Sequence, residues 1–379
     1  MDYKQKIEQL KRQDLLRSVR DRDCPSGRVI KIEGRSLLNF SSNDYLGLAS
    51  HPVVIGAAHQ ALDDFGYGAG ASRLLSGGTS LAARLERKTA SFKGTDKAVL
   101  FNSGYAANTG AIASLTDEHS TIFSDALNHA SIVDGCRLSC AARHIYNHND
   151  LNHLEELLRQ SRSFHKVVIT ESVFSMDGDI ADIYDLHLLC GKYNAVLYVD
   201  DAHATGVLGQ GRGALAHFGF TPSDDIIQMG TYSKALGSLG GFIAASSSVC
   251  DYLVNTARSF IYSTALAASA AAASLAAIDH ITAHTELVEK LHDNIISCRR
   301  ALISKGFPVT QALTPIIPIV FDSTPETLRI AGRLLDIGIY APAIRPPTVK
   351  QPRIRISISA FHEKADIVNL AGALSEAIR

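Results

Sequence analysis

An acidic residue and a lysine each follow a predicted buried strand in this chain. Residues 196–199 are apolar and mostly β-branched or aromatic, and Asp200 follows them directly. Residues 226–229 form a similar run, which leads through Gly-Thr-Tyr-Ser to Lys234. A buried acid can keep a pyridine nitrogen protonated, and a lysine amine can form a Schiff base with an aldehyde. The pair therefore predicts a pyridoxal 5'-phosphate (PLP) site, with PLP covalently bound to Lys234.

Two residues with small hydroxyl side chains, Thr231 and Ser233, shortly precede Lys234. Most lysines lie at the surface without a specific role, but a surface lysine is not expected among small and hydroxyl side chains. The two hydroxyls can donate hydrogen bonds to a phosphate while the amine attacks the aldehyde of the same cofactor. For Asp200, taken alone, an acid that caps a helix is the favoured alternative.

A phosphate also needs backbone amides, and the segment around Ser103, Gly104 and Tyr105 offers them. Ser103 and Gly104 lie between a predicted strand and a predicted helix, where free amides and the helix dipole favour an anion. Tyr105 can flank a cofactor ring. Taken alone, the segment is explained equally well as an ordinary capped helix start.

Three further polar residues follow predicted strands, namely His129, Ser175 and His203. We expect His129 to stack on the cofactor ring and His203 to reach its phenolic oxygen; capping, core or solvated histidines are the alternatives. In open α/β sheets, ligands bind at the carboxyl ends of the strands. The convergence of polar residues at four consecutive strand ends is therefore more specific than any one of them.

Arg345 lies near the C-terminal end and is followed by two prolines that restrict its backbone. An arginine offers a bidentate fork that fits a carboxylate, so Arg345 is a candidate for the substrate carboxylate. The alternative is a solvated arginine.

Short apolar strands alternate with helical segments through the middle of the chain, which predicts an α/β fold with a mostly parallel sheet flanked by helices. A smaller α+β domain is predicted after it. The expected division is an N-terminal helix and hairpin segment at residues 1–50, a large PLP-binding domain at 51–284, and a small C-terminal domain at 285–379.

Composition excludes several classes of function. The chain has 379 residues and a formal net charge of -1, so nothing indicates a nucleic-acid partner or an anionic membrane. Its six cysteines show no CxxC pair and no metal-ligand spacing, which predicts a cytoplasmic protein with reduced thiols and no metal. No apolar run is long enough to span a bilayer, and no P-loop sequence is present.

The sequence resembles the α-oxoamine synthases, a family of fold type I PLP-dependent transferases. The resemblance runs from about residue 14 to the C-terminus. It rests on four motifs: NFSSNDYLGL at 39–48, VFSMDGD at 173–179, DDAH at 200–203 and TYSK at 231–234.

The resemblance implies a role for each matching residue. Catalytic roles fall to Lys234, His129, Asp200 and His203. Contacts to PLP are implied for Ser103, Gly104, Tyr105, His129, Ser175, Asp200, His203, Thr231, Ser233 and Lys234. Thr264 is expected to reach the phosphate of the neighbouring subunit, so the resemblance also implies a homodimer. Substrate contacts are implied for Arg17, Asn43, His129, Arg345 and Thr348.

The family's reaction is a decarboxylating condensation of an amino acid with an acyl thioester. The run AIRPPTV at 343–349 favours the members that join L-alanine to a pimeloyl thioester, on CoA or on acyl carrier protein (ACP). Glycine or serine with another acyl-CoA, as in 2-amino-3-ketobutyrate CoA ligase, is the main alternative. An aminotransferase and a non-catalytic PLP-binding regulator are the others, and the lack of a basic DNA-binding extension disfavours the regulator.

Overall fold

A computed structural model describes residues 2–220 and 222–379. The chain separates into two compact units. Unit 1 comprises residues 1–47, 176–179 and 289–379, and unit 2 comprises residues 48–175 and 180–288. The N-terminal segment thus belongs to the same unit as the C-terminal region. The three-part division expected from the sequence stays a prediction.

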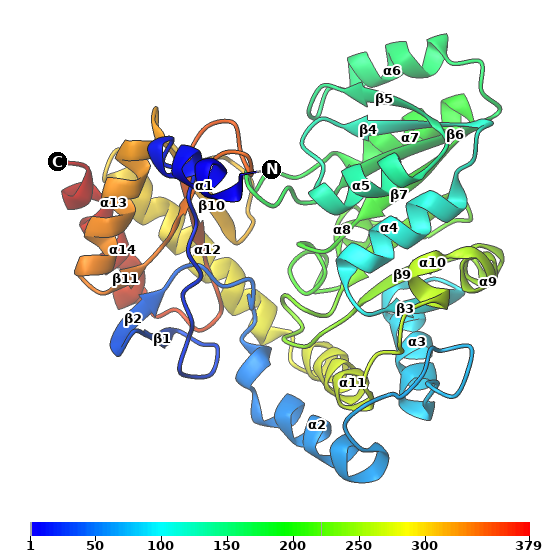
Figure 1. Ribbon diagram of the computed structural model, residues 1–379, viewed down its shortest axis with the longest axis horizontal. Coiled ribbons are helices and arrows are strands. Elements are labelled where there is room, and N and C mark those ends of the chain that lie inside the picture. Colours follow the sequence, from blue (N-terminus) through cyan, green and yellow to red (C-terminus); the bar gives the residue numbers. More distant parts are fainter. Residues whose placement is uncertain (1, 221) are drawn as a thin grey trace. The chain divides into compact units, whose positions relative to one another are not determined.

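Unit 2 is built on a seven-stranded sheet in the order β3-β9-β8-β7-β6-β4-β5 (Figure 1). Strands β8, β7, β6, β4 and β5 run parallel, and β9 is antiparallel to both of its neighbours. The mostly parallel sheet predicted from the sequence is therefore confirmed. The strands are β3 (Lys97–Phe101), β4 (Ser120–Asp125), β5 (Ala142–Tyr146), β6 (His165–Glu171), β7 (Ala195–Asp200), β8 (Ile226–Thr231) and β9 (Gly241–Ala245).

Helices cover both faces of this sheet. One buried cluster joins side chains of the strands to helices α4, α5, α9 and α10, while α3 and α7 pack on the sheet as well. Capping residues set several helix ends: Ser103 accepts the Ala106 amide at the start of α4, and Gly94 closes α3 in the left-handed conformation. The helices of unit 2 are η1 (Leu48–Ser50), α2 (Pro52–Phe65), α3 (Ser80–Lys93), α4 (Gly104–Leu115), α5 (Ala130–Leu138), α6 (Leu151–Gln160), α7 (Ile183–Tyr193), α8 (Ala214–His217), α9 (Ser247–Thr256), α10 (Arg258–Ile261) and α11 (Ala268–Ala283).

Unit 1 contains two three-stranded sheets, ordered β1-β2-β11 and β10-β13-β12. β1 and β2 form the antiparallel hairpin that the alternating sequence predicts. The strands are β1 (Val29–Ile32), β2 (Arg35–Asn39), β10 (Ile316–Val320), β11 (Ile339–Tyr340), β12 (Ala343–Ile344) and β13 (Arg353–Ser357). The helices are α1 (Tyr3–Arg12), α12 (Glu286–Ser304), α13 (Thr324–Asp336) and α14 (Lys364–Ile378), with α12 beginning in the last residues of unit 2.

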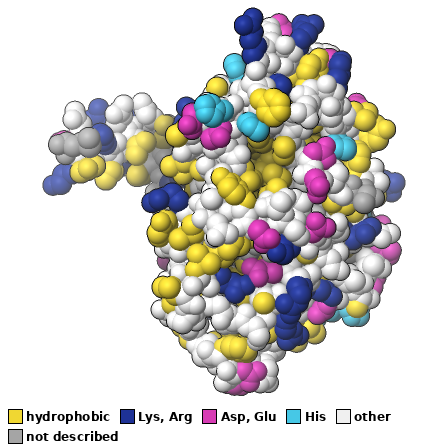
Figure 2. All heavy atoms as spheres, turned by 90° about the vertical axis from the view of Figure 1, so that its right-hand side faces the viewer, with side chains coloured by type: hydrophobic (Ala, Val, Ile, Leu, Met, Phe, Trp, Pro, Cys, Tyr) yellow, Lys and Arg dark blue, Asp and Glu magenta, His cyan; other side chains and the backbone are white. Residues whose placement is uncertain are grey.

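The molecular surface carries mixed charge. Figure 2 shows lysine and arginine side chains interspersed with acidic ones, and neither sign forms a continuous field on that face. Among the described residues, no helix has the length and apolarity needed to cross a membrane. Within the same residues, no three His, Cys, Asp or Glu side chains gather in a way that could hold a metal ion.

Candidate functional site

Four parallel strands of unit 2 each end on a buried polar residue. The last residues of β4, β6, β7 and β8 are Asp125, Glu171, Asp200 and Thr231, and each is at most 5% exposed. Their strands are direct neighbours in the order β8, β7, β6, β4. The sheet therefore lines these side chains up along one edge, where α/β proteins bind their ligands.

A chain of hydrogen bonds links Asp200 to His129. The Asn108 side-chain amide donates to Asp200 Oδ2 at 2.7 Å and to Ser131 Oγ at 2.8 Å. The Ser131 hydroxyl lies 2.8 Å from His129 Nδ1. Tyr198 donates its hydroxyl to Asn108 Oδ1 at 2.8 Å, which fixes the orientation of the amide. Asn108, fully buried in α4, thus connects β7 to the start of α5.

Asp200 is well supplied with donors. Besides the Asn108 amide, the backbone amide of Ala202 donates to Oδ1 at 3.0 Å. A buried carboxylate that accepts two hydrogen bonds can remain negatively charged. A negative charge at this position would in turn favour the protonated form of a ring nitrogen placed against it.

His129 caps the first turn of α5 and presents its ring at the same edge. The Ser131 amide donates to Nδ1 at 3.2 Å, and the Tyr105 ring lies edge-on with ring centroids 6.3 Å apart. Although the residue is solvent-exposed, the surrounding protein removes enough water from the ring to lower its pKa. The charge of Asp200 raises this pKa and that of Lys234 lowers it. His129 is thus neutral at and above neutral pH, as suits a ring that stacks on a flat ligand.

Lys234 lies in a tight turn after β8. Gly237 donates its amide to the Lys234 carbonyl at 2.9 Å, and Tyr232 is pinned beneath the turn by a 2.6 Å hydrogen bond with Thr89. Thr231 donates its hydroxyl to the Gly240 carbonyl at 2.7 Å, and its oxygen lies 2.7 Å from the Ser233 hydroxyl. These contacts fix the backbone around Lys234, which is partly buried.

Two glycines allow close packing where α4 starts. A Cβ on Gly104 would lie 2.9 Å from Met229, and one on Gly241 would lie 2.6 Å from the Ser103 carbonyl. The close approach lets the first amides of α4 lie beside the end of β8. The Tyr105 hydroxyl donates to Asp134 and holds the ring over this start. Backbone amides at a helix start can bind a phosphate.

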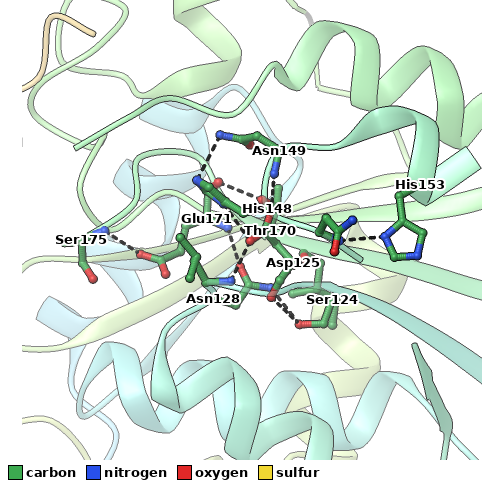
Figure 3. A network of polar contacts seen from close by, with 12 residues as sticks. Ser124, Asp125, Asn128, His148, Asn149, His153, Thr170, Glu171 and Ser175 are labelled. Atoms are coloured by element: carbon green, nitrogen blue, oxygen red, sulfur yellow. Dashed lines mark hydrogen bonds and ion pairs between the residues drawn. The ribbon is translucent and has the colours of Figure 1, made fainter. Parts of the chain in front are cut away.

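Glu171 is a buried acid that the sequence reasoning did not single out. Its Oε2 accepts the Ser175 amide at 3.3 Å, while Oε1 is buried without a hydrogen-bond partner. Asn128 accepts the Glu171 backbone amide at 3.0 Å and donates to Ser124 at 2.9 Å (Figure 3). Burial raises the pKa of the Glu171 carboxyl well above its usual range, and the Asp200 charge raises it further.

The second acid of the Asp-Asp pair has a different task. Asp201 forms an ion pair with Lys93 at 2.6 Å, and both side chains are completely buried. Asp201 also accepts the Ser172 hydroxyl at 2.7 Å and the Ala214 amide at 3.1 Å. These bonds hold the segment after β7 that carries His203, which is itself 4% exposed.

Three predicted substrate residues gather in unit 1. Arg17 donates to the carbonyl of Pro346 at 3.1 Å and to Thr348 Oγ1 at 3.2 Å. Arg345 donates to the Leu16 carbonyl, and burial and the nearby Arg17 lower its pKa. Both arginines line a cavity of about 420 Å³ together with apolar residues of α13. This cavity can receive an anionic group attached to an apolar chain.

The other predicted contact residues lie elsewhere. Asn43, in unit 1, accepts hydrogen bonds at its Oδ1 from both terminal nitrogens of Arg355, each at 3.1 Å. Thr264, in unit 2, is exposed; its carbonyl accepts the Asn102 side-chain amide at 2.7 Å. Neither residue lies in the hydrogen-bond chain between Asp200 and His129.

Within unit 2, Asp200 and His129 share one hydrogen-bond chain, and Lys234 is close enough to influence the pKa of His129. Asn108, Glu171 and Lys93 are the residues that sequence reasoning missed. For Glu171 the signal was present, since it ends an apolar strand just as Asp200 does. For Asn108 the only signal was a lone amide inside an apolar helix.

Comparison with known proteins places these residues in a family. Residues 35–374 match the family described as aminotransferase class I and II. The 8-amino-7-oxononanoate synthase of Citrifermentans bemidjiense is 45% identical over 380 residues, covering 99% of this chain and 97% of that protein.

Two solved structures extend the comparison. A serine palmitoyltransferase variant from S. paucimobilis, with a bound PLP–myriocin aldimine, gives a TM-score of 0.93 at 28% identity, covering 98% of this chain and 96% of that one. The 8-amino-7-oxononanoate synthase of Francisella tularensis gives a TM-score of 0.79 at 28% identity, covering 90% of this chain and 97% of that one.

Proposed function

Because the chain belongs to the aminotransferase class I and II family, and within it to the α-oxoamine synthases, we propose that it is an 8-amino-7-oxononanoate synthase. The reaction condenses L-alanine with a pimeloyl thioester on CoA or ACP, releasing CO2 and the thiol carrier, as a step of biotin biosynthesis. The observation that carries this proposal is the near full-length 45% identity to a synthase of that name.

The residues of unit 2 fit PLP. The cradle at the start of α4 leaves no room for a Cβ on Gly241, which would lie 2.6 Å from the Ser103 carbonyl, and the buried Asp200 keeps two donors. In the proposal, the amides of Gly104 and Tyr105 and the hydroxyl of Ser103 would bind the phosphate. The hydroxyls of Thr231 and Ser233 would join them by turning away from the Gly240 carbonyl and from each other. Asp200 would hold the ring nitrogen and His203 the phenolic oxygen, while His129 and Ser175 would contact the ring.

When bound, PLP supplies an electron-poor ring that stabilises negative charge on the amino-acid Cα. The chain's own residues then do the following. Lys234 Nζ would hold the cofactor and, as a free amine, would take the proton from the amino-acid Cα. Asn108 and the Ala202 amide both donate to Asp200 and would orient its carboxyl group toward the ring nitrogen. His129 would cover the ring and exclude water from the reacting face.

In unit 1, we assign the substrate's anionic groups to the arginines. Arg345 is suited to a carboxylate, since its Nε is buried without a hydrogen-bond partner and Arg17 nearby adds positive charge. Arg17 and Thr348, joined by a 3.2 Å hydrogen bond, are assigned to the acyl substrate. Asn43 is assigned to the pocket wall.

We also propose a homodimer in which Thr264 serves the phosphate site of the partner subunit. Support comes from exposed apolar side chains in the same part of unit 2, with Tyr67 at 85%, Leu75 at 78% and Tyr262 at 72% exposure. The cytoplasmic location expected from the cysteine pattern stays a prediction; all six cysteines are free thiols.

The function is tested by thiol release. We expect purified protein loaded with PLP to release CoA from pimeloyl-CoA when L-alanine is added, with a Schiff-base absorbance that Lys234→Ala abolishes together with turnover. A Lys234→Ala protein that turned over at the normal rate would overturn the proposal.

A second candidate is another α-oxoamine synthase, which the TM-score of 0.93 to serine palmitoyltransferase favours. A substrate panel separates the two: alanine, glycine and serine are each combined with pimeloyl, acetyl, succinyl and palmitoyl thioesters. Fastest release with serine and palmitoyl-CoA would support the second candidate. Formation of a keto acid without CoA release would instead indicate an aminotransferase.

A further inference from the structure

The three acids at the carboxyl edge of the sheet are not equally supplied with hydrogen-bond donors. Asp125 Oδ1 accepts the Leu127 amide at 2.8 Å and lies 2.9 Å from His148 Nδ1, and its Oδ2 accepts the Asn149 amide at 3.0 Å (Figure 3). Asp200 has the Asn108 side chain and the Ala202 amide. Glu171, between them in the sheet, has the Ser175 amide at 3.3 Å and an oxygen with no partner.

Glu171 and Asp200 are register partners on neighbouring parallel strands. Side chains of register partners lie on the same face of a sheet, so the two carboxyl groups are close, and both are buried, at 2% and 5% exposure. Two neighbouring buried carboxyls do not both ionise readily, because each charge disfavours the other. The member with the better donors keeps the charge, and that member is Asp200.

Resting on the proposed function, we propose that Glu171 is a positioning residue that stays protonated in the working protein, with its neutral carboxyl leaving Asp200 as the charged member of the pair. Its Oε2 accepts the Ser175 amide and so holds Ser175 at the edge of the site. A neutral oxygen without a partner costs less free energy when buried than a charged one, which accounts for the unpaired Oε1.

The charged and titratable groups that face Glu171 agree with this assignment. Burial raises its pKa most and Asp200 on β7 raises it further, while Lys234 after β8 and the Ser175 amide lower it. A group whose pKa is raised on folding stabilises the protein below its ordinary pKa. That stability is lost as pH rises through the folded-state value.

The test replaces Glu171 with its neutral isostere. In Glu171→Gln loaded with PLP, the spectroscopic pKa of the Lys234 Schiff base is titrated by absorbance between pH 5 and 10. A neutral Glu171 predicts a shift of less than about 0.3 units. An ionised Glu171 predicts a fall of about one unit or more, because a negative charge near the Schiff-base cation has been removed, and that result overturns the inference. Asp200→Asn is the positive control and should move the pKa strongly or weaken PLP binding.

Thermal stability gives a second readout that does not depend on the chromophore. The quantity compared is the Tm of Glu171→Gln minus the Tm of the unmodified protein. We expect this difference to increase by about 2 °C or more between pH 5 and pH 8. Asp125→Asn is the matched control, since it removes a carboxylate that donors surround, and its Tm should fall. If the Tm difference for Glu171→Gln stays constant with pH, the inference fails.

The outcomes distinguish this inference from the proposed function. If the unmodified protein forms no Schiff-base absorbance with PLP, the proposed function fails, and the Tm comparison still reports whether Glu171 is protonated. Glu171→Met, neutral and of similar length, supplies the same measurements if the glutamine variant does not fold.

Discussion

Asn108 joins the acid and the imidazole of the site through a single amide group. Its two N–H bonds are divided between Asp200 and Ser131, and its oxygen is occupied by Tyr198. Every polar atom of this side chain is thus used: two of the bonds join it to β7, through Asp200 and Tyr198, and one joins it to α5, through Ser131. An amide with all of its bonds fixed sets the position of both Asp200 and, through Ser131, His129.

We predict that Asn108→Ala weakens PLP binding by about tenfold and lowers the free energy of unfolding by about 1–3 kcal/mol, because a buried carboxylate loses a donor. PLP affinity is measured by absorbance titration and stability by urea denaturation. Tyr198→Phe is the control, since it removes one bond to Asn108 and leaves the donor to Asp200 in place. A larger loss of PLP affinity in Tyr198→Phe than in Asn108→Ala would contradict this assignment.

At the scale of elements, a buried ion pair fixes the segment that follows β7. Lys93, the last residue of α3, donates to Asp201 and to the Arg212 carbonyl, both at 2.6 Å. A Cβ on Gly213 would lie 1.8 Å from Asp201 Oδ2, so the backbone must pass close to the pair. The end of α3 and both ends of the segment 201–213 therefore meet at one buried ion pair.

Removing one member of the Lys93–Asp201 ion pair should strongly destabilise the protein. We predict that Lys93→Met lowers the free energy of unfolding by about 3–5 kcal/mol, since it leaves Asp201 buried without its counter-charge. The double variant Lys93→Met/Asp201→Asn should regain part of the loss in urea denaturation. Lys97→Met breaks an exposed ion pair with Asp251 and should have little effect. If Lys93→Met and Lys97→Met lost equal free energy of unfolding, the burial of the Lys93–Asp201 pair would be unimportant.

A second element-level prediction concerns the buried ring of His362. The ring stacks on Phe40 at 4.3 Å, its Nδ1 accepts the Ser359 amide at 3.0 Å, and Nε2 therefore donates to the Asn39 carbonyl at 3.0 Å. Burial lowers its pKa, so folding favours the neutral ring and stability is lost as pH falls below about 6.5. We predict a steeper fall in Tm from pH 7 to 5 for the unmodified protein than for His362→Gln. Parallel curves would refute this.

At the scale of the whole molecule, the sequence predicts what depends on local pattern. Strands β7 and β8 are recognisable because largely apolar runs end in a polar residue, and this also locates Asp200 and, shortly after β8, Lys234. Strand β9 is missed because it begins with glycine and ends in alanines, which have low strand propensity. Its place between β3 and β8 comes from tertiary packing alone.

The site residues divide in the same way. Lys93 reads as an ordinary basic residue at a helix end, because the Asp201 that neutralises it lies 108 positions away. The Asn108 contacts with Asp200 and Tyr198 likewise join residues 92 and 90 positions apart. No local pattern encodes such pairs, and only the fold brings them together.

The proposed dimer predicts complementation between two defective chains. In a mixed dimer of Lys234→Ala and Thr264→Glu chains, one site would combine an intact Lys234 with the partner's intact Thr264. We expect about half of the normal activity in isolated mixed dimers, although each parent is inactive or weak. If the mixed dimer is no more active than its parents, Thr264 does not serve the partner's site.

The position of β9 has a consequence for how the protein matures on the ribosome. Strand β3 pairs only with β9 in the sheet, and Phe101 finds its partner in Gly241. The turn that starts α4 follows β3 directly, so it cannot take its place until about 140 further residues have been synthesised. The nascent chain therefore cannot complete this part of the site until β9, the last strand of the seven-stranded sheet along the chain, has been made.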